Sequence, residues 1–200
     1  QIVVKLLNHE HSPFLKWTFL NAFPIKFDTS GISSTSKDVM LDSITFHPEL
    51  GSLGDKTQRI GDLISSVYSV VNVDPSLAAR AVNLSRCDLV TEMVIEFDEL
   101  QGQIGRIYAA NDGENPIVAD AIGGLYQPSG LSDTVPHDLL GSLLGLCDRI
   151  DTLCGLFAIG QPPSGSKDPF GLRRAAIGIL RLNEHLELRL DLVPLLHQSI

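Results

Sequence analysis

Basic residues and cysteines are scarce in this sequence, and both shortages narrow what the protein can do. Its 200 residues include 15 Lys and Arg against 24 Asp and Glu, a formal net charge of −9. An acidic chain is not a general binder of polyanions, so we expect no DNA partner, and any RNA contact must come from a local basic patch. The cysteines are far apart and form no CxxC pair, which disfavours a zinc site and favours buried, reduced thiols at Cys87, Cys147 and Cys154.

Long apolar runs are also missing. No stretch approaches the roughly 20 apolar residues that cross a bilayer, so we expect no membrane contact. The apolar run at residues 2–7 is short and interrupted by Lys5, so no signal peptide is visible and a cytoplasmic location is expected. The sequence starts at Gln1 and not at Met, and we therefore expect a fragment of a longer protein.

Helical spacing dominates the apolar residues beyond about residue 37. Residues Ile60, Leu63, Ile64 and Val67 follow the i, i+3, i+4, i+7 pattern of an amphipathic helix. Few segments alternate as strands do, so the predicted fold class is mainly α, a bundle of about eight helices. The expected helices cover residues 37–46, 55–71, 75–87, 102–110, 116–125, 136–159, 168–182 and 193–198.

The first 36 residues fit no clean period. Ile2-Val3-Val4 is a candidate strand, and Pro13 and Pro24 break up the residues after it. The Gly/Ser/Thr-rich loop at residues 31–36 is the best candidate boundary. We therefore expect an irregular segment, or the edge of a neighbouring domain, over 1–36, and a helical domain over 37–200.

The stretch 165–182 combines a helix start with two misplaced cations. Asp168 before Pro169 predicts a capped helix beginning there, because the carboxylate accepts from free N–H groups and Pro needs no N–H at the first helical position. Arg173 and Arg174 then fall in the first two turns, where the helix dipole disfavours cations. A carboxylate or a phosphate should compensate them.

Three aspartates interrupt apolar helical faces, which pure packing does not explain, since buried carboxylates need partners. One interpretation is that Asp88, Asp148 and Asp151 are metal ligands or acid–base groups. The other is that they form ion pairs, with candidate partners Arg149, Arg173 and Arg174.

The order of these residues resembles the HD-domain superfamily of all-α metal-dependent phosphohydrolases, with the ligands changed. Where that family has its first His, this chain has Lys56, three residues before Arg59-Ile60; the His-Asp pair resembles Cys87-Asp88; and the distant Asp resembles Asp148. Lysine is a poor metal ligand, so we expect no metal at these degenerate positions. The dipeptide His137-Asp138 follows Pro136 and is interpreted as helix-start chemistry at the surface. The resemblance implies an HD-like helical bundle.

Five motifs in order resemble a more specific family, the beta subunits of bacterial heteromeric glycine–tRNA ligases, over about residues 50–182. They are LGSLGDKTQRI (50–60), CDLVTEMV (87–94), ELQG (99–102), CDRIDTL (147–153) and GSKDPFGLRRAA (165–176). The chain is therefore identified as resembling the central HD-like domain of such a subunit.

The resemblance implies a division of labour. In that family the alpha subunit activates glycine with ATP and magnesium, and the beta subunit supplies tRNA-binding domains. Its HD-like domain has lost the metal chemistry. We therefore expect this chain to bind or brace glycine tRNA and the alpha subunit, to need no cofactor itself, and to have no catalytic residue.

The candidate RNA contacts are basic: Lys56, Arg59, Lys167, Arg173, Arg174 and Arg181. Two alternatives stay open. The chain could be an active HD-type phosphohydrolase, or a purely structural module that contacts the alpha subunit. No catalytic triad, phosphate loop or dinucleotide signature is present.

Overall fold

The computed structural model describes residues 2–7, 13–19, 41–68, 70–186 and 190–199. Contacts within the chain divide it into residues 1–36 and residues 37–200. In the first unit, strand β1 (Ile2–Leu7) pairs antiparallel with β2 (Pro13–Phe19), so that Lys5 lies opposite Lys16. A segment expected to be irregular therefore contains a hairpin. The predicted loop at 31–36 and the start of the predicted helix at 37–40 lie outside the described residues.

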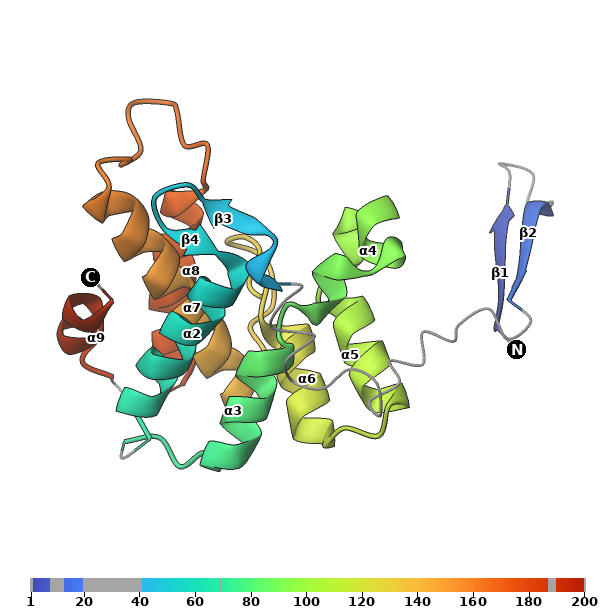
Figure 1. The fold of residues 1–200 in the computed structure, drawn as a ribbon, viewed down its shortest axis with the longest axis horizontal. Helices are drawn as coiled ribbons and strands as arrows, with labels where there is room; N and C mark the ends of the chain where they lie inside the picture. Colours follow the sequence, from blue (N-terminus) through green and yellow to red (C-terminus); the bar gives the residue numbers. More distant parts are fainter. Residues whose placement is uncertain (1, 8–12, 20–40, 69, 187–189, 200) are drawn as a thin grey trace. The chain divides into compact units, whose positions relative to one another are not determined.

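The second unit is helical, which confirms the mainly α fold class (Figure 1). Within this unit a small antiparallel pair, β3 (Thr45–His47) and β4 (Gly51–Ser52), comes before the helices, and β3 replaces the end of the helix predicted over 37–46. Eight α-helices and two 3₁₀ turns follow in the described chain: α2 (Leu53–Ser66), α3 (Pro75–Leu84), η1 (Cys87–Val90), α4 (Glu92–Glu96), η2 (Asp98–Leu100), α5 (Gln103–Asn111), α6 (Pro116–Gly124), α7 (Leu139–Ala158), α8 (Leu172–His185) and α9 (Leu192–Gln198).

Side-chain caps fix where most of these helices begin. Asp74, Asn115 and Asp191 accept hydrogen bonds from the first free N–H groups of α3, α6 and α9. Asp138 caps α7 through the N–H of Gly141, which confirms the helix-start interpretation of His137-Asp138. The predicted start at Pro136 is wrong, because the helical hydrogen bonds begin only after this cap.

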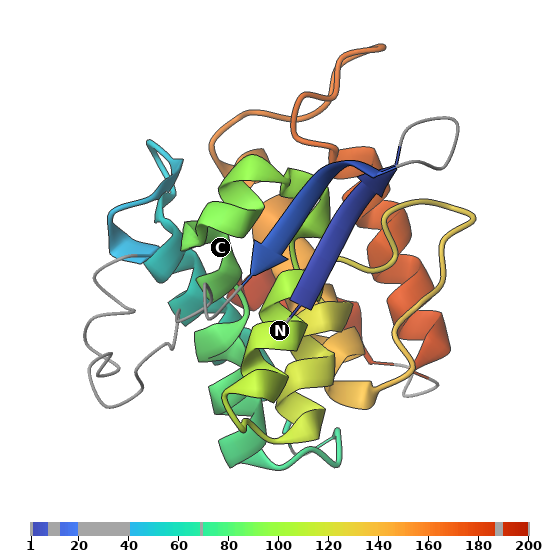
Figure 2. The ribbon, with the colours of Figure 1, turned by 90° about the vertical axis from the view of Figure 1, so that its right-hand side faces the viewer.

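The helix predicted to start at Asp168-Pro169 begins three residues later. Asp168 still satisfies its first turn, since its carboxylate accepts from the N–H groups of Leu172 at 2.8 Å and Arg173 at 3.0 Å. The chain between them forms a loop that ends at Gly171, whose φ of +67° favours glycine. The loop 159–171 projects from the helices in both Figures 1 and 2, where it is coloured orange.

Helix α7 forms the centre of the core. It contacts α2, α3, α6, α8 and α9. Its apolar face, including Leu143, Leu144, Leu146 and Ile150, is fully buried. All three cysteines are thiols and not disulfides; Cys147 and Cys154 are buried as expected, whereas Cys87 is partly exposed. Within the described residues, no helix has both the length and the hydropathy needed to cross a lipid bilayer.

Candidate functional site

A buried ion-pair network joins α2 to α7. Lys56 of α2 is only 3% exposed. Its ammonium donates to Asp151 Oδ2 at 2.9 Å and to Thr152 Oγ1 at 2.6 Å, and it lies 3.1 Å from Asp148 Oδ1. The same nitrogen lies 4.6 Å from the centre of the Phe46 ring, a cation–π contact. Every donor of the Lys56 ammonium is therefore used inside the protein.

Two arginines complete the network. Arg86, directly before η1, is buried and pairs with Asp148. Arg59 of α2 donates to Asp151 at 2.5 Å and to the carbonyl of Leu50 at 3.0 Å. Burial alone raises the pKa of Asp148, but Lys56 and Arg86 overcome this effect and lower that pKa to about 2. Asp148 is therefore ionised, and both carboxylates of the network are paired with cations.

The positions compared above with an HD metal site do not suit a metal. Lys56 places a cation against Asp148, where a metal would need a neutral or anionic ligand. Cys87 points elsewhere, with its thiol 3.4 Å from the carbonyl of Asn83. Asp88 accepts from the N–H of Gly102 at 2.6 Å. No group of three His, Cys, Asp or Glu side chains in the described part of the chain could hold a metal ion.

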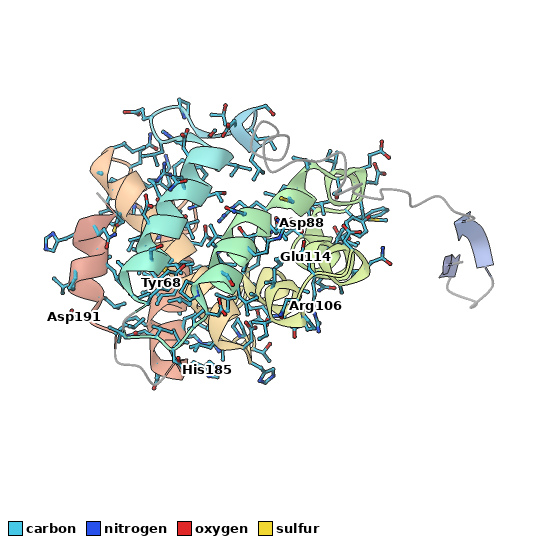
Figure 3. The ribbon with its side chains drawn as sticks, turned by 60° about the horizontal axis from the view of Figure 1, so that its bottom comes forward. Tyr68, Asp88, Arg106, Glu114, His185 and Asp191 are labelled. Atoms are coloured by element: carbon cyan, nitrogen blue, oxygen red, sulfur yellow. The ribbon has the colours of Figure 1, made fainter. Side chains whose placement is uncertain are left out.

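Asp88 is a structural anchor between η1 and α5 (labelled in Figure 3). Burial raises the pKa of its carboxyl group, although backbone N–H groups of Gly102 and Gly105 oppose this shift. Gly105 is needed here, because a Cβ would lie 3.1 Å from Asp88 Oδ2 and closer still to Ile122. The carboxylate thus holds the turn that starts α5.

The interpretation of Asp148 and Asp151 as ion-paired carboxylates is confirmed, but the candidate partners Arg149, Arg173 and Arg174 are wrong. Distant cations, Lys56, Arg59 and Arg86, occupy the carboxylates instead. Arg149 turns the other way and donates to the carbonyls of Leu125, Gly145, Tyr126 and Pro128. Sequence reasoning missed the roles of Arg86 and Arg149. The position of Arg86 directly before Cys87-Asp88 was the available signal.

The six candidate RNA contacts separate into two groups. The prediction that Lys56 contacts RNA is wrong, because its side chain is buried and all its hydrogen-bond donors have partners inside the protein. Arg59 is one third exposed and bound to Asp151, and Arg181 donates to the carbonyls of Gly130 and Asp133, both at 2.6 Å. The exposed group is Lys167, Arg173 and Arg174.

The exposed cations gather where the loop 159–171 enters α8. We call them, together with Phe170 and His47, the basic–aromatic corner. Arg173 donates to the carbonyl of Gly165 at 2.6 Å. Arg174 forms no side-chain hydrogen bond or ion pair with the residues that the structure describes. The rings of Phe170 and His47 meet edge to face, with their centres 6.0 Å apart.

Comparison with known proteins matches the part of the chain that contains both the buried ion-pair network and the basic–aromatic corner. A family described as "Glycyl-tRNA synthetase beta subunit" matches residues 31–200. The chain is 51% identical over 164 residues to a glycine–tRNA ligase beta subunit of Chromohalobacter salexigens, covering 82% of this chain. Corresponding subunits of Marinobacter nauticus and Coxiella burnetii are 49% and 48% identical over 76% and 80% of it.

The chain belongs to the glycyl-tRNA synthetase beta-subunit family. It spans about a quarter of the length of these relatives, from 22% to 24%. The five sequence motifs named above have clear structural roles in this chain. The first and fourth supply the buried network, the second and third meet where Asp88 binds Gly102, and the fifth forms the basic–aromatic corner.

Proposed function

We propose that this chain is a domain of a glycine–tRNA ligase beta subunit that contacts glycine tRNA through the basic–aromatic corner and performs no chemistry itself. The observation that carries the proposal is the exposure of Lys167, Arg173 and Arg174 on one corner of an acidic chain. These cations are not consumed by Asp148 and Asp151. They remain available for phosphate, which supplies most of the affinity of proteins for RNA.

The local charge balance supports phosphate binding. Asp168 is the one carboxylate of the loop 159–171, and its oxygens already accept from the backbone of α8. Hydrogen bonds from that backbone, chiefly from Arg173, and the charges of Arg173 and Arg174 lower the pKa of Asp168. The corner therefore keeps an excess of positive charge even with Asp168 ionised.

The buried network supports the second half of the proposal. It replaces the donor set of an HD metal site with an ammonium and a guanidinium, so a phosphohydrolase activity has no support here. On this proposal, activation of glycine with ATP and magnesium takes place in the alpha subunit, and this domain positions the tRNA.

The test uses the complete alpha–beta enzyme and glycine tRNA. Arg174→Gln should weaken tRNA binding several-fold and reduce the slope of log affinity against log salt by roughly one. Arg106→Gln removes a charge from an exposed arginine on α5 and should leave both quantities unchanged. Equal behaviour of the two variants would contradict the proposal.

A second surface favours an additional function in subunit contact. Ile95 of α4 is 72% exposed and Phe97, directly after it, is 46% exposed. The exposed carboxylates around them are Glu92, Glu96, Asp98 and Glu99. This acidic–apolar face repels RNA and suits a protein surface with an apolar centre and basic rim. We assign it to the alpha subunit, because the relatives are beta subunits.

The acidic–apolar face lies away from the basic–aromatic corner, since α4 and the loop 159–171 are on different sides of the helices in Figure 1. Ile95→Asn should weaken assembly of the two subunits, measured by sedimentation, about tenfold or more. Val70→Asn, at a similarly exposed residue outside this face, is the control. Unchanged assembly of the Ile95 variant would remove this assignment.

A further inference from the structure

We infer that the basic–aromatic corner binds unpaired nucleotides, with a base stacked on Phe170 and a neighbouring phosphate held by Arg174. This inference rests on the proposed tRNA contact and specifies its ligand. It starts from an aromatic ring that the core does not use. Phe170 is 41% exposed at the end of a projecting loop, beside two arginines.

The ring of Phe170 is positioned by a neighbouring ring that leaves its face exposed. Phe170 meets His47 at an interplanar angle of 71°, and an edge contact of this kind covers less of a ring than stacking does. His47 is itself positioned on β3, where its Nδ1 accepts from the N–H of Glu49 at 3.2 Å. The two rings come from segments more than 100 residues apart, so the tertiary fold builds this pair.

The backbone brings a cation close to Gly171, the residue after Phe170. Gly171 adopts φ +67°, and a Cβ there would lie 3.1 Å from Arg174 Nη2. The guanidinium of Arg174 therefore folds back over the residue that follows Phe170. Its hydrogen-bonding groups have no partner among the described residues, so they are free to bind a phosphate oxygen.

The loop that carries these groups is braced. Ser164 and Lys167 exchange two backbone hydrogen bonds of 3.0 and 2.8 Å. Arg173 ties the end of the loop to Gly165, and Asp168 ties it to α8. Ordering of the loop is therefore largely complete before RNA arrives, which lowers the entropic cost of binding.

The combination of an exposed ring with an adjacent cation distinguishes unpaired from paired RNA. Bases in an A-form duplex stack on one another and present only sugars, phosphates and a shallow groove edge. A base in a loop or at a free end can lie flat on an aromatic side chain, while Arg or Lys binds its backbone. Cations alone would bind both forms of RNA.

The experiment measures binding of two probes to the complete alpha–beta enzyme: a 12-nucleotide oligouridine and a 12-base-pair RNA duplex. The unmodified enzyme should prefer the single strand. Phe170→Leu should lose roughly 5- to 100-fold of single-strand affinity, the range typical of one stacked base, with an unchanged salt slope. Phe170→Trp should restore binding. The exposure of Phe170 means that these variants keep the melting temperature of the parent.

The outcomes separate the two proposals. If Phe170→Leu binds the single strand as the parent does, or if the duplex binds equally well, stacking is wrong. If Arg174→Gln still weakens glycine tRNA binding in that case, the proposed tRNA contact stands. If neither variant changes binding of oligouridine or glycine tRNA, both proposals fail.

Discussion

Lys56 controls the electrostatics of the interior, because it is the one residue that contacts both carboxylates of α7 in the network. Its sequence position suggested a surface cation or a displaced metal ligand. Burial gives it a different role. The ammonium makes the carboxylates of Asp148 and Asp151 tolerable beside a largely apolar core, where an unpaired carboxylate would be costly.

Replacing this lysine should therefore cost much more than replacing an exposed partner in an ion pair. Lys56→Met should lower the free energy of unfolding by about 3–5 kcal/mol, since it leaves buried charge uncompensated. Arg106→Met breaks a pair with Asp120 that is exposed on both sides and should cost about 1 kcal/mol or less. Urea unfolding of both variants measures the difference, and similar losses would show that the network is not effectively buried. Arg106 is labelled in Figure 3.

Asp148 should make the free energy of unfolding depend on pH in the acidic range. Its pKa is held at about 2 in the folded chain and rises to about 4 on unfolding. Its contribution is therefore complete above pH 4 and disappears as the pH falls from 4 to 2. The gap in unfolding free energy between the parent and Asp148→Asn should narrow by roughly 2 kcal/mol over that range. A gap that stays constant in urea titrations at pH 5, 4, 3 and 2.5 would contradict this role of Asp148.

At the scale of helices, features set by neighbouring residues could be predicted from the sequence, whereas ion-pair partners that are distant in sequence could not. The expected helix starts at residues 75, 116 and 193 agree with α3, α6 and α9 to within one residue, because each start is set by a cap directly before the helix, at Asp74, Asn115 or Asp191. The start of α8 was misplaced because Asp168 acts across a loop. The partners of the aspartates on α7 were wrong because Arg59 and Arg86 come from 92 and 62 residues away, and only tertiary packing selects them.

The same limit applies to the candidate RNA contacts. Composition marks Lys167, Arg173 and Arg174 as surface residues, because they fall in a Gly/Pro/Ser-rich loop and the helix turn after it. Lys56 has equally polar neighbours in sequence, yet it is buried. Lys56 is buried because α2 packs against α7, and nothing in the local sequence indicates that packing. The contact between the His47 and Phe170 rings could likewise not be predicted from any pattern along the sequence.

Close helix packing gives a sharp test at this scale. A Cβ on Gly178 of α8 would lie 2.6 Å from Nε of Arg149, whose guanidinium is fixed by its carbonyl partners and cannot move aside. Gly178→Ala should therefore destabilise the protein by about 1–3 kcal/mol. Gly61→Ala on α2 places the new methyl at an ordinary 3.7 Å from Val82 and should stabilise by about 0.5–1 kcal/mol. Thermal unfolding should show shifts of opposite sign; an unchanged or raised melting temperature for Gly178→Ala would mean that α7 and α8 are not packed as closely as this.

For the whole molecule, the distribution of charge matters more than the total. The chain carries a net charge of −9, yet exposed basic residues follow one another from the loop 159–171 into α8, whereas exposed carboxylates gather in and after α4, which lies on another side of the helices in Figure 1. On the proposed function, a domain with this charge distribution would attract RNA at one corner and reject it at another. The separation would then let tRNA and a protein subunit bind at the same time.

The last prediction concerns which part of the chain folds as a unit. The buried core extends from Ile60 to Leu195, and residues 37–200 form one contact unit separate from residues 1–36. A chain shortened to 37–200 should therefore unfold cooperatively, with a melting temperature within about 4 °C of the parent, the shift that roughly 1 kcal/mol produces in a protein of this size. Circular dichroism at 222 nm follows the helices directly. A larger drop, or a broad transition, would show that residues 1–36 belong to the same cooperative unit as the helical core.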